Sequence, residues 1–261
     1  MASAHTHISA GLLLGVVVGG ALHLDAGVMA LFAVSSGGAA LLPDADTKDS
    51  AVHNAGGLIS KFPLWCFRTA THKHRGPTHS PFFLVLIFLG VCYLGHLFTS
   101  SRGWLPPAWP DRLVLPALLA VLFTRTALTI GTPENFRPLL SKSRRRLIML
   151  FVAFVVGYCG YVLGAAPHFA LGMALSVGAG YASHLLTDWT TARGIPLKWP
   201  FSSRRYALAN IKVGGFIDYF SGVAFFVGAV CLFIATAHGG TVAIPGAGYV
   251  THSIGRVAPK L

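Results

Sequence analysis

Two short motifs carry side chains that could bind a metal ion. In HRGPTHS, His74 and His79 lie five residues apart, and in SHLLTD, His184 and Asp188 are spaced i, i+4. The second spacing places an imidazole and a carboxylate on one face of a helix. Imidazole and carboxylate ligands together suit zinc, manganese or iron. The two motifs therefore predict a metal site built from separate parts of the chain.

The HRGPTHS motif also predicts where the following helix begins. Gly76-Pro77 turns the chain, Ser80 can cap the next helix, and Pro81 takes its first position. This arrangement fixes His79 at the start of a helix. His74 can then fold back beside it.

A third motif, LLPDAD, adds two carboxylates at the end of an earlier apolar run. Pro43 disfavours helix at Leu42, so we expect an extended segment in which Asp44 and Asp46 point the same way. His7 precedes the first apolar run. The candidate metal ligands are His7, Asp44, Asp46, His74, His79, His184 and Asp188.

Seven candidate ligands are more than one tetrahedral site needs, so we expect one or two divalent ions. Zinc is the expected metal, with manganese or iron as alternatives. Two ions bridged by a carboxylate would leave positions for water. We expect Asp44 and Asp188 to be ligands and Asp46 to bridge metals or act on water. Arg75 is placed to hold an anionic group beside the site. Asp46 and Arg75 are therefore the predicted catalytic residues.

The elements that must position these residues are transmembrane helices. Of the 261 residues, 54% are hydrophobic and 11% are charged, and the mean hydropathy is +0.64. These values predict an all-α, polytopic membrane protein. Residues 1–240 form one predicted transmembrane domain, and 241–261 form a short tail. The seven predicted spans are 8–24, 27–42, 81–99, 112–131, 147–165, 168–187 and 215–237.

The basic residues predict which side of the membrane carries the motifs. Fifteen Lys and Arg lie in the connections 43–80, 132–146 and 188–214, against four in the connections and tail on the other side. The positive-inside rule makes the fifteen-charge side cytoplasmic, with the ligand motifs at that end of the helices. The net charge of +12 is thereby explained without nucleic acid, and membrane lipids are the expected partners. Arg204 and Arg205 could orient a lipid headgroup, or they could be present only because cytoplasmic loops are rich in basic residues.

At these residues the chain resembles the YdjM-type family of predicted membrane-bound metal-dependent hydrolases. The motifs that carry the resemblance are LLPDAD, HRGPTHS, GYASHLLTDWTTARG, PLKWPF and RRYAL, over roughly residues 5–210. The resemblance implies metal binding at the seven positions named above. Family members often carry a histidine after the second aspartate, where this chain has Thr47. The family is also distantly similar to zinc-dependent phospholipases C, which implies phosphoester chemistry.

The leading functional interpretation is an inner-membrane hydrolase that uses a metal-activated water on a phosphoester or lipid-related substrate at the cytoplasmic face. One alternative is a non-catalytic membrane protein with a structural metal. A metal-ion transporter is a weaker alternative, because transporters place ligands near the bilayer midplane. The simplest alternatives for the residues themselves are a hydrogen-bonded pair for His184 and Asp188 and a polar helix stop for Asp44 and Asp46.

Overall fold

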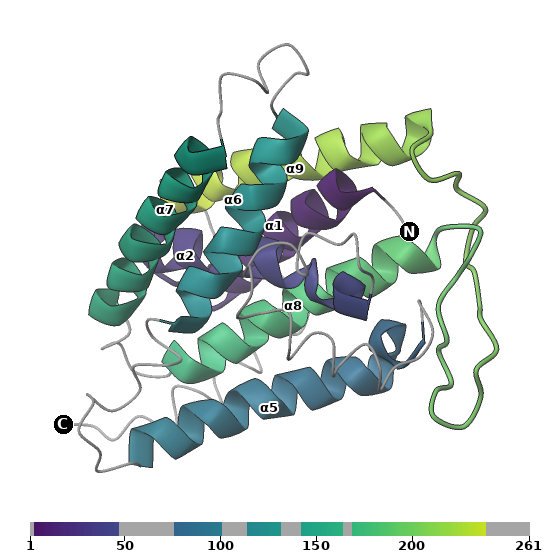
Figure 1. Ribbon diagram of the computed structural model, residues 1–261, viewed down its shortest axis with the longest axis horizontal. Coiled ribbons are helices and arrows are strands. Elements are labelled where there is room, and N and C mark those ends of the chain that lie inside the picture. Colours follow the sequence, from purple (N-terminus) through teal and green to yellow (C-terminus); the bar gives the residue numbers. More distant parts are fainter. Residues whose placement is uncertain (1–2, 47–75, 101–113, 132–141, 164–168, 239–261) are drawn as a thin grey trace.

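The computed structural model describes residues 3–46, 76–100, 114–131, 142–163 and 169–238. Within these ranges the chain is all-helical, as its composition predicts, and extended pairing is limited to two isolated bridges. Each predicted apolar run corresponds to one α-helix (Figure 1). The elements are α1 (Ala4–Ala21), α2 (Ala26–Ala39), the 3-10 turns η1 (Leu42–Asp46) and η2 (Pro77–His79), α5 (Pro81–Ser100), α6 (Leu115–Gly131), α7 (Lys142–Leu163), α8 (Phe169–Trp189) and α9 (Phe216–Ala237).

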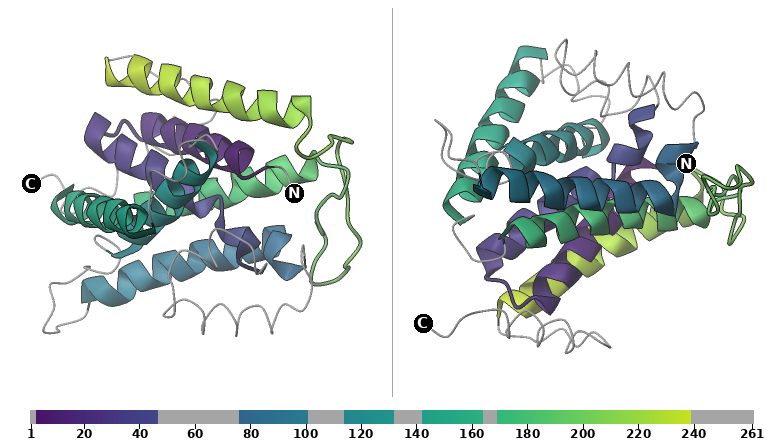
Figure 2. Two further views of the ribbon diagram at one scale, coloured as in Figure 1. Left: turned by 45° about the horizontal axis from the view of Figure 1, so that its top comes forward. Right: turned by 90° about the horizontal axis from the view of Figure 1, so that it is seen from below.

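Three helices in the described ranges are long and apolar enough to cross a membrane. They are α1, α2 together with the turn that follows it to Asp44, and α9. In Figure 1, α6 and α7 run steeply across the direction of α5, α8 and α9, and the left view of Figure 2 shows these last three helices in a similar direction. The membrane character of the chain is therefore supported, and the number of seven spans stays a prediction.

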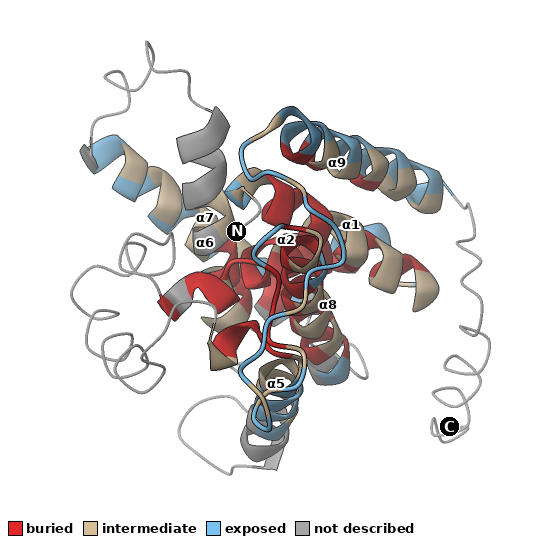
Figure 3. Cartoon of the chain, turned by 90° about the vertical axis from the view of Figure 1, so that its right-hand side faces the viewer, coloured by how far each residue is buried: buried red, intermediate tan, exposed pale blue. Residues whose placement is uncertain are grey.

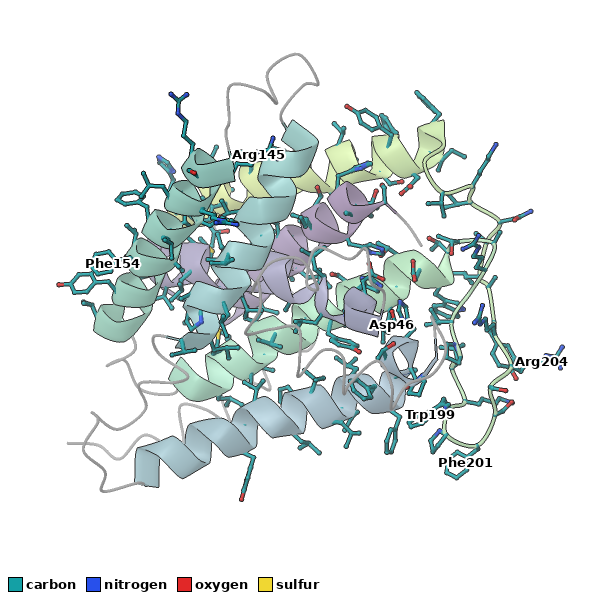
Figure 4. The ribbon with its side chains drawn as sticks, in the orientation of Figure 1. Asp46, Arg145, Phe154, Trp199, Phe201 and Arg204 are labelled. Carbon is teal, nitrogen blue, oxygen red and sulfur yellow. The ribbon has the colours of Figure 1, made fainter. Side chains whose placement is uncertain are left out.

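The buried core lies where α1, α2 and α8 pack together, with α5 and α9 on opposite sides (Figure 3). Phe32 of α2 and Met173 and Val177 of α8 are almost fully buried there. The outer helices instead turn large apolar side chains outward, such as Phe154 of α7, which is 72% exposed (Figure 4). An outward apolar surface around a buried core is what a lipid environment favours.

Close packing of the central helices depends on glycine. A Cβ at Gly15 of α1 would lie 2.6 Å from the Cα of Ala33 in α2. A Cβ at Gly180 of α8 would overlap the backbone carbonyl oxygen of Ser36 in α2. Small residues at such crossings let helix backbones approach each other. Gly180 precedes His184 by one turn, so this contact also sets the depth of a candidate ligand.

The structure corrects the sequence prediction at two helix ends. Asp44 and Asp46 lie in the 3-10 turn η1, which begins at Leu42, rather than in an extended segment. Pro43 fits this turn because its fixed φ suits the first positions of a helix, where its missing N–H is not needed. In addition, α1 begins at Ala4, so His7 lies inside this helix instead of before it.

The cap predicted for α5 is present. Its first residue is Pro81, and the hydroxyl oxygen of Ser80 accepts a hydrogen bond from the backbone N–H of Phe83 at 3.2 Å. A serine side chain in this position satisfies one of the free N–H groups at the helix start. The cap fixes the direction in which α5 leaves His79.

The start of α9 is tied to the start of α1 by Asp218. Its carboxylate accepts hydrogen bonds from the Thr6 hydroxyl at 2.7 Å, from the Gly214 N–H at 2.8 Å and from the Ser3 N–H at 3.1 Å. Asp218 is buried, and these donors replace the water it loses. The carboxylate is therefore structural, and it fixes the end of α1 that carries His7.

Replacing Gly180 by alanine should separate α8 from α2. The new methyl group meets the backbone of Ser36, so we expect a loss of about 1–3 kcal/mol in stability, as for other overpacked cores. Gly90 of α5 provides the control, because a Cβ there meets nothing within 4 Å. The Gly90→Ala variant should hold or gain stability, by up to about 1 kcal/mol. Thermal unfolding of the two variants in detergent measures the difference, and equal melting temperatures would contradict the packing account.

Candidate metal centre

Five of the predicted ligands converge on one buried point. They come from α1 (His7), η1 (Asp44), η2 (His79) and α8 (His184 and Asp188). Their donor atoms form two groups, His7–Asp44–His184 and His79–His184–Asp188, each with all atoms within 4.8 Å of one another. Residues as far apart in sequence as His7 and Asp188 thus meet at one end of the bundle.

Each of the three histidines is held through its Nδ1 atom. His184 Nδ1 lies 2.6 Å from the carbonyl oxygen of Ala40, and so it must donate. His7 Nδ1 lies 2.7 Å from the Thr187 hydroxyl, which donates its own hydrogen to backbone carbonyls one turn earlier. The hydroxyl therefore accepts from His7.

His79 is held in the same way. Its Nδ1 lies 3.0 Å from the Thr78 hydroxyl, which donates to Asp46 at 3.0 Å. With Nδ1 protonated in all three rings, each Nε2 carries a free electron pair. Such second contacts fix the tautomer and orientation of metal-binding histidines. The three Nε2 atoms face the same point.

The distances between the facing atoms are characteristic of a metal site. His79 Nε2 and His184 Nε2 are 3.3 Å apart, and both lie 3.5–3.7 Å from carboxylate oxygens of Asp44 and Asp188. A charge-assisted hydrogen bond would be about 2.7–2.9 Å long. Ligand atoms about 2.0–2.1 Å from a tetrahedral zinc ion are about 3.3 Å from one another. The spacing of these side chains is compatible with ligands around an ion.

Burial and charge also fit a divalent cation. The side chains of His7, His79, His184 and Asp188 are fully buried. Nε2 of His7 is a buried atom for which the described part of the chain provides no hydrogen-bond partner. Two carboxylates beside three neutral imidazoles would leave two negative charges in a low-dielectric interior, which is costly. A divalent cation would offset that charge and could accept the electron pair of His7.

His184 decides how the two groups are related. Its Nε2 belongs to both, and a neutral imidazole nitrogen has one electron pair for one ion. The groups are therefore parts of one centre and not two independent sites. If two ions occupied this centre, Asp188 would be placed to hold both. One of its oxygens is 3.6 Å from His7, and the other is 3.6 Å from His79.

Asp46 lies on the outer side of His79. Its Oδ2 accepts the Thr78 hydroxyl and is 3.7 Å from Nδ1 of His79, the nitrogen that faces away from the centre. Asp46 belongs to neither ligand group. Its direct coordination of a metal stays a prediction. His74 and Arg75, the other predicted site residues, lie outside the described residues.

Three residues at the site were missed by the sequence analysis. Thr78 and Thr187 hold the Nδ1 atoms of His79 and His7, and the Tyr181 hydroxyl donates to the backbone carbonyl of Thr78. Both threonines stand inside the motifs PTHS and HLLTD, beside the ligands. Their position there was the available signal. Tyr181 lies three residues before His184 and seven before Asp188, so helical spacing places it on the face of these ligands and was the available signal.

The centre is least buried at Asp44, whose side chain is 10% exposed. A cavity of about 190 Å³ lies on another side, between α8, α9 and the start of α1, and Thr6, Thr187 and Asp218 line it. His7 is not among the residues that line this cavity. Oδ1 of Asp44, the oxygen that faces His79 and His184, is buried.

Comparison with known proteins identifies a family. The family model for the YdjM inner membrane protein matches residues 1–255. The match confirms the resemblance seen in the motifs and extends beyond residues 5–210. No curated protein and no solved structure matches the chain significantly.

Removing a facing histidine should remove metal. The variants His79→Ala and His184→Ala each delete one Nε2 donor, so we expect each to lower the bound metal of the purified protein strongly. Elemental analysis measures the metal, and circular dichroism checks that the helices persist. Full metal content in both variants would show that these histidines do not converge on an ion.

The Thr187→Val variant should weaken metal binding without touching a ligand. The change keeps the side-chain shape but removes the acceptor for His7 Nδ1, and losses of such contacts typically cost about 10–100-fold in metal affinity. Thr190→Val, directly after the end of α8, is the matched control, since its hydroxyl donates to the backbone carbonyl of Thr187. Competition with a metal chelator gives both affinities. Equal affinities would mean that Thr187 does not orient His7.

Proposed function

Because the chain belongs to the YdjM inner membrane protein family, we propose that it is an integral, multi-pass inner-membrane hydrolase that depends on a divalent metal, zinc first. The reaction would be hydrolysis of a phosphoester or lipid-related substrate at the cytoplasmic face. The observation that carries the proposal is the convergence of three Nδ1-anchored histidines with Asp44 and Asp188. Their facing atoms are separated by 3.3–3.7 Å.

The ligand set supports chemistry at the metal. It combines imidazole with carboxylate and contains no cysteine, and hydrolytic zinc sites commonly use such sets. A bound metal of this kind lowers the pKa of a water molecule toward neutrality and polarises a phosphoryl or acyl oxygen. His7, His79, His184, Asp44 and Asp188 would hold it.

The residues around the ligands orient them and control access. Thr78, Thr187 and the carbonyl of Ala40 keep the three imidazoles in one tautomer. The fully buried rings of His7 and His184, stacked with centroids 3.8 Å apart, close one side of the centre to water. The partly exposed Asp44 marks the side from which a substrate would enter.

Asp46 would move the proton. It is the one site carboxylate in the described residues that stands outside both ligand groups, so its oxygens are not required for holding the ion. It is connected to His79 through the Thr78 hydroxyl. Arg75, which follows His74 directly in the sequence, would hold the anionic group of the substrate.

One observation favours a second function, a structural metal in a non-catalytic membrane protein. Four of the five converging side chains are completely buried. If all five coordinate one ion, the site is closed, as structural sites are. The two functions differ in whether the metal keeps a position for water.

Asparagine substitutions should separate the roles of the carboxylates. Asp46→Asn keeps size but removes charge and basicity, so we expect retained metal and a turnover lower by about 10²–10⁴. Asp188→Asn should lose metal first. Metal content and hydrolysis of a chromogenic phosphodiester and of phospholipid vesicles are measured together, with Thr78→Val as the variant that removes the hydroxyl between Asp46 and His79.

The same experiment decides between the two functions. The asparagine variants at Asp44, Asp46 and Asp188 are compared with the wild type. If all three bind metal and hydrolyse a substrate at the wild-type rate, these carboxylates do not act in catalysis and the enzyme proposal fails. Bound metal with no hydrolysis of any phosphoester or lipid would favour the structural role.

A further inference from the structure

The connection between α8 and α9 is a strongly basic segment at the same end of the molecule as the metal centre. It covers residues 190–215, which we call the strap. The strap contains five basic residues and no acidic residue. Figure 3 looks onto this end and shows the strap crossing it from α9 to α5. The exposed basic residues are Arg193, Lys198, Arg204, Arg205 and Lys212.

The strap is held firmly against the helices. Ile195 is 2% exposed and packs in a cluster with Tyr181 and Leu185 of α8. Ile195 and Tyr206 exchange backbone hydrogen bonds of 3.0 and 2.9 Å across the strap. These contacts fix the backbone, so its exposed side chains point outward from a defined scaffold.

The tip of the strap carries an aromatic side chain that the fold leaves in the open. Phe201 is 96% exposed and points away from the bundle (Figure 4). Its neighbour Trp199 instead turns inward, edge-on to Phe82 of α5, with ring centroids 5.4 Å apart. Full exposure of a phenylalanine on a fixed loop is unfavourable in water, and it indicates a surface that contacts something apolar.

The contact with Phe82 places this tip at one end of an outward apolar stripe. Phe82, Val85, Leu89 and Tyr93 recur at helical spacing along α5, and each is 43–61% exposed. Such a stripe is the surface that α5 would turn toward lipid. Phe201 therefore lies where that surface ends and the basic segment begins.

The basic side chains are arranged around the tip. The Lys198 ammonium lies 5.7 Å and the Arg204 guanidinium 5.8 Å from the ring centre of Tyr206. Cation–π contacts of this kind hold charged groups at an aromatic face. In Figure 4, Arg204 points outward to the right of the strap, and Phe201 lies at the lower tip. An apolar tip is thus flanked by fixed positive charges.

We propose that the strap docks into the headgroup layer of the membrane and binds anionic phospholipids, with Phe201 inserted between the headgroups. Aromatic residues are enriched at the membrane interface, and basic residues beside them attract anionic lipid. The inference rests on the proposed function, since it requires this end of the bundle to face the inner leaflet. A nucleic acid would match the charge, but it does not account for the apolar tip at the end of the α5 stripe.

Docking would bring lipid phosphate groups close to the metal centre. The strap begins two residues after Asp188, and Phe82 lies three residues after His79. Both ligands therefore lie close in sequence to residues of the proposed docking surface. Anionic phospholipids of the inner leaflet are the substrate class that this placement favours.

The test compares lipid binding by variants of the full chain in detergent. Phosphatidylglycerol or phosphatidylcholine with a fluorescent acyl chain is titrated, and energy transfer from tryptophan reports binding. We expect the wild type to prefer phosphatidylglycerol. Arg204→Ala/Arg205→Ala should reduce this preference by roughly five-fold for each arginine removed, and Phe201→Ser should weaken binding of both lipids.

The matched control removes the same charge elsewhere. Arg144→Ala/Arg146→Ala changes two basic residues at the start of α7 and should leave most of the preference intact. Equal binding of both lipids by the wild type, equal losses in the two double variants, or displacement of the lipid by RNA would overturn the proposal. Metal content of the strap variants is measured in parallel. If the wild type binds metal but does not prefer phosphatidylglycerol, only the proposed lipid binding by the strap is contradicted. If the wild type binds no metal, the proposed hydrolase is contradicted.

Discussion

The arrangement of this end of the molecule depends on burying polar ligand side chains among apolar helices. Each of three buried imidazoles has an N–H that needs an acceptor, and an unsatisfied buried donor costs about 1–3 kcal/mol. The acceptors are Thr187 of α8, Thr78 of η2 and the carbonyl of Ala40 after α2. For His7 and His184 the acceptor belongs to a different segment from the ligand. The hydrogen bonds that satisfy these two imidazoles therefore also fix the segments relative to one another.

The helix α8 is the element on which these contacts meet. On successive turns it provides the close approach to α2 at Gly180, the ligands His184 and Asp188, and the acceptor Thr187. Tyr181 of the same helix donates to the backbone of Thr78 and so positions η2. A shift of α8 would move ligands and acceptors together, which makes the geometry of the centre depend on helix packing rather than on flexible loops.

Contacts outside the centre hold the same end in place. Asp218 joins the starts of α9 and α1, and Ile195 anchors the strap against α8. Neither contact uses a ligand, so the helix ends are organised before any ion is bound. Preorganised ligands suit catalysis, because little structural change is then needed when charge develops.

Local chemistry determined much of this from the sequence alone. The apolar runs predicted the helices, Ser80 and Pro81 predicted the start of α5, and the i, i+4 spacing predicted that His184 and Asp188 share a face, where they lie 3.7 Å apart. These features involve neighbours within one turn, whose geometry the helix itself fixes. The motifs also named all five converging ligands, because few polar residues occur in so apolar a chain.

Only the tertiary structure decided what surrounds the ligands. That Thr187 accepts from His7 and that Asp46 stands behind Thr78 depend on contacts between distant segments, and hydropathy and spacing contain no information about them. The helical state of His7 and the 3-10 turn at Asp44 were mispredicted for the same reason. Polar residues look like helix ends in a hydropathy profile, but here they continue helical structure because the fold supplies buried partners for their side chains.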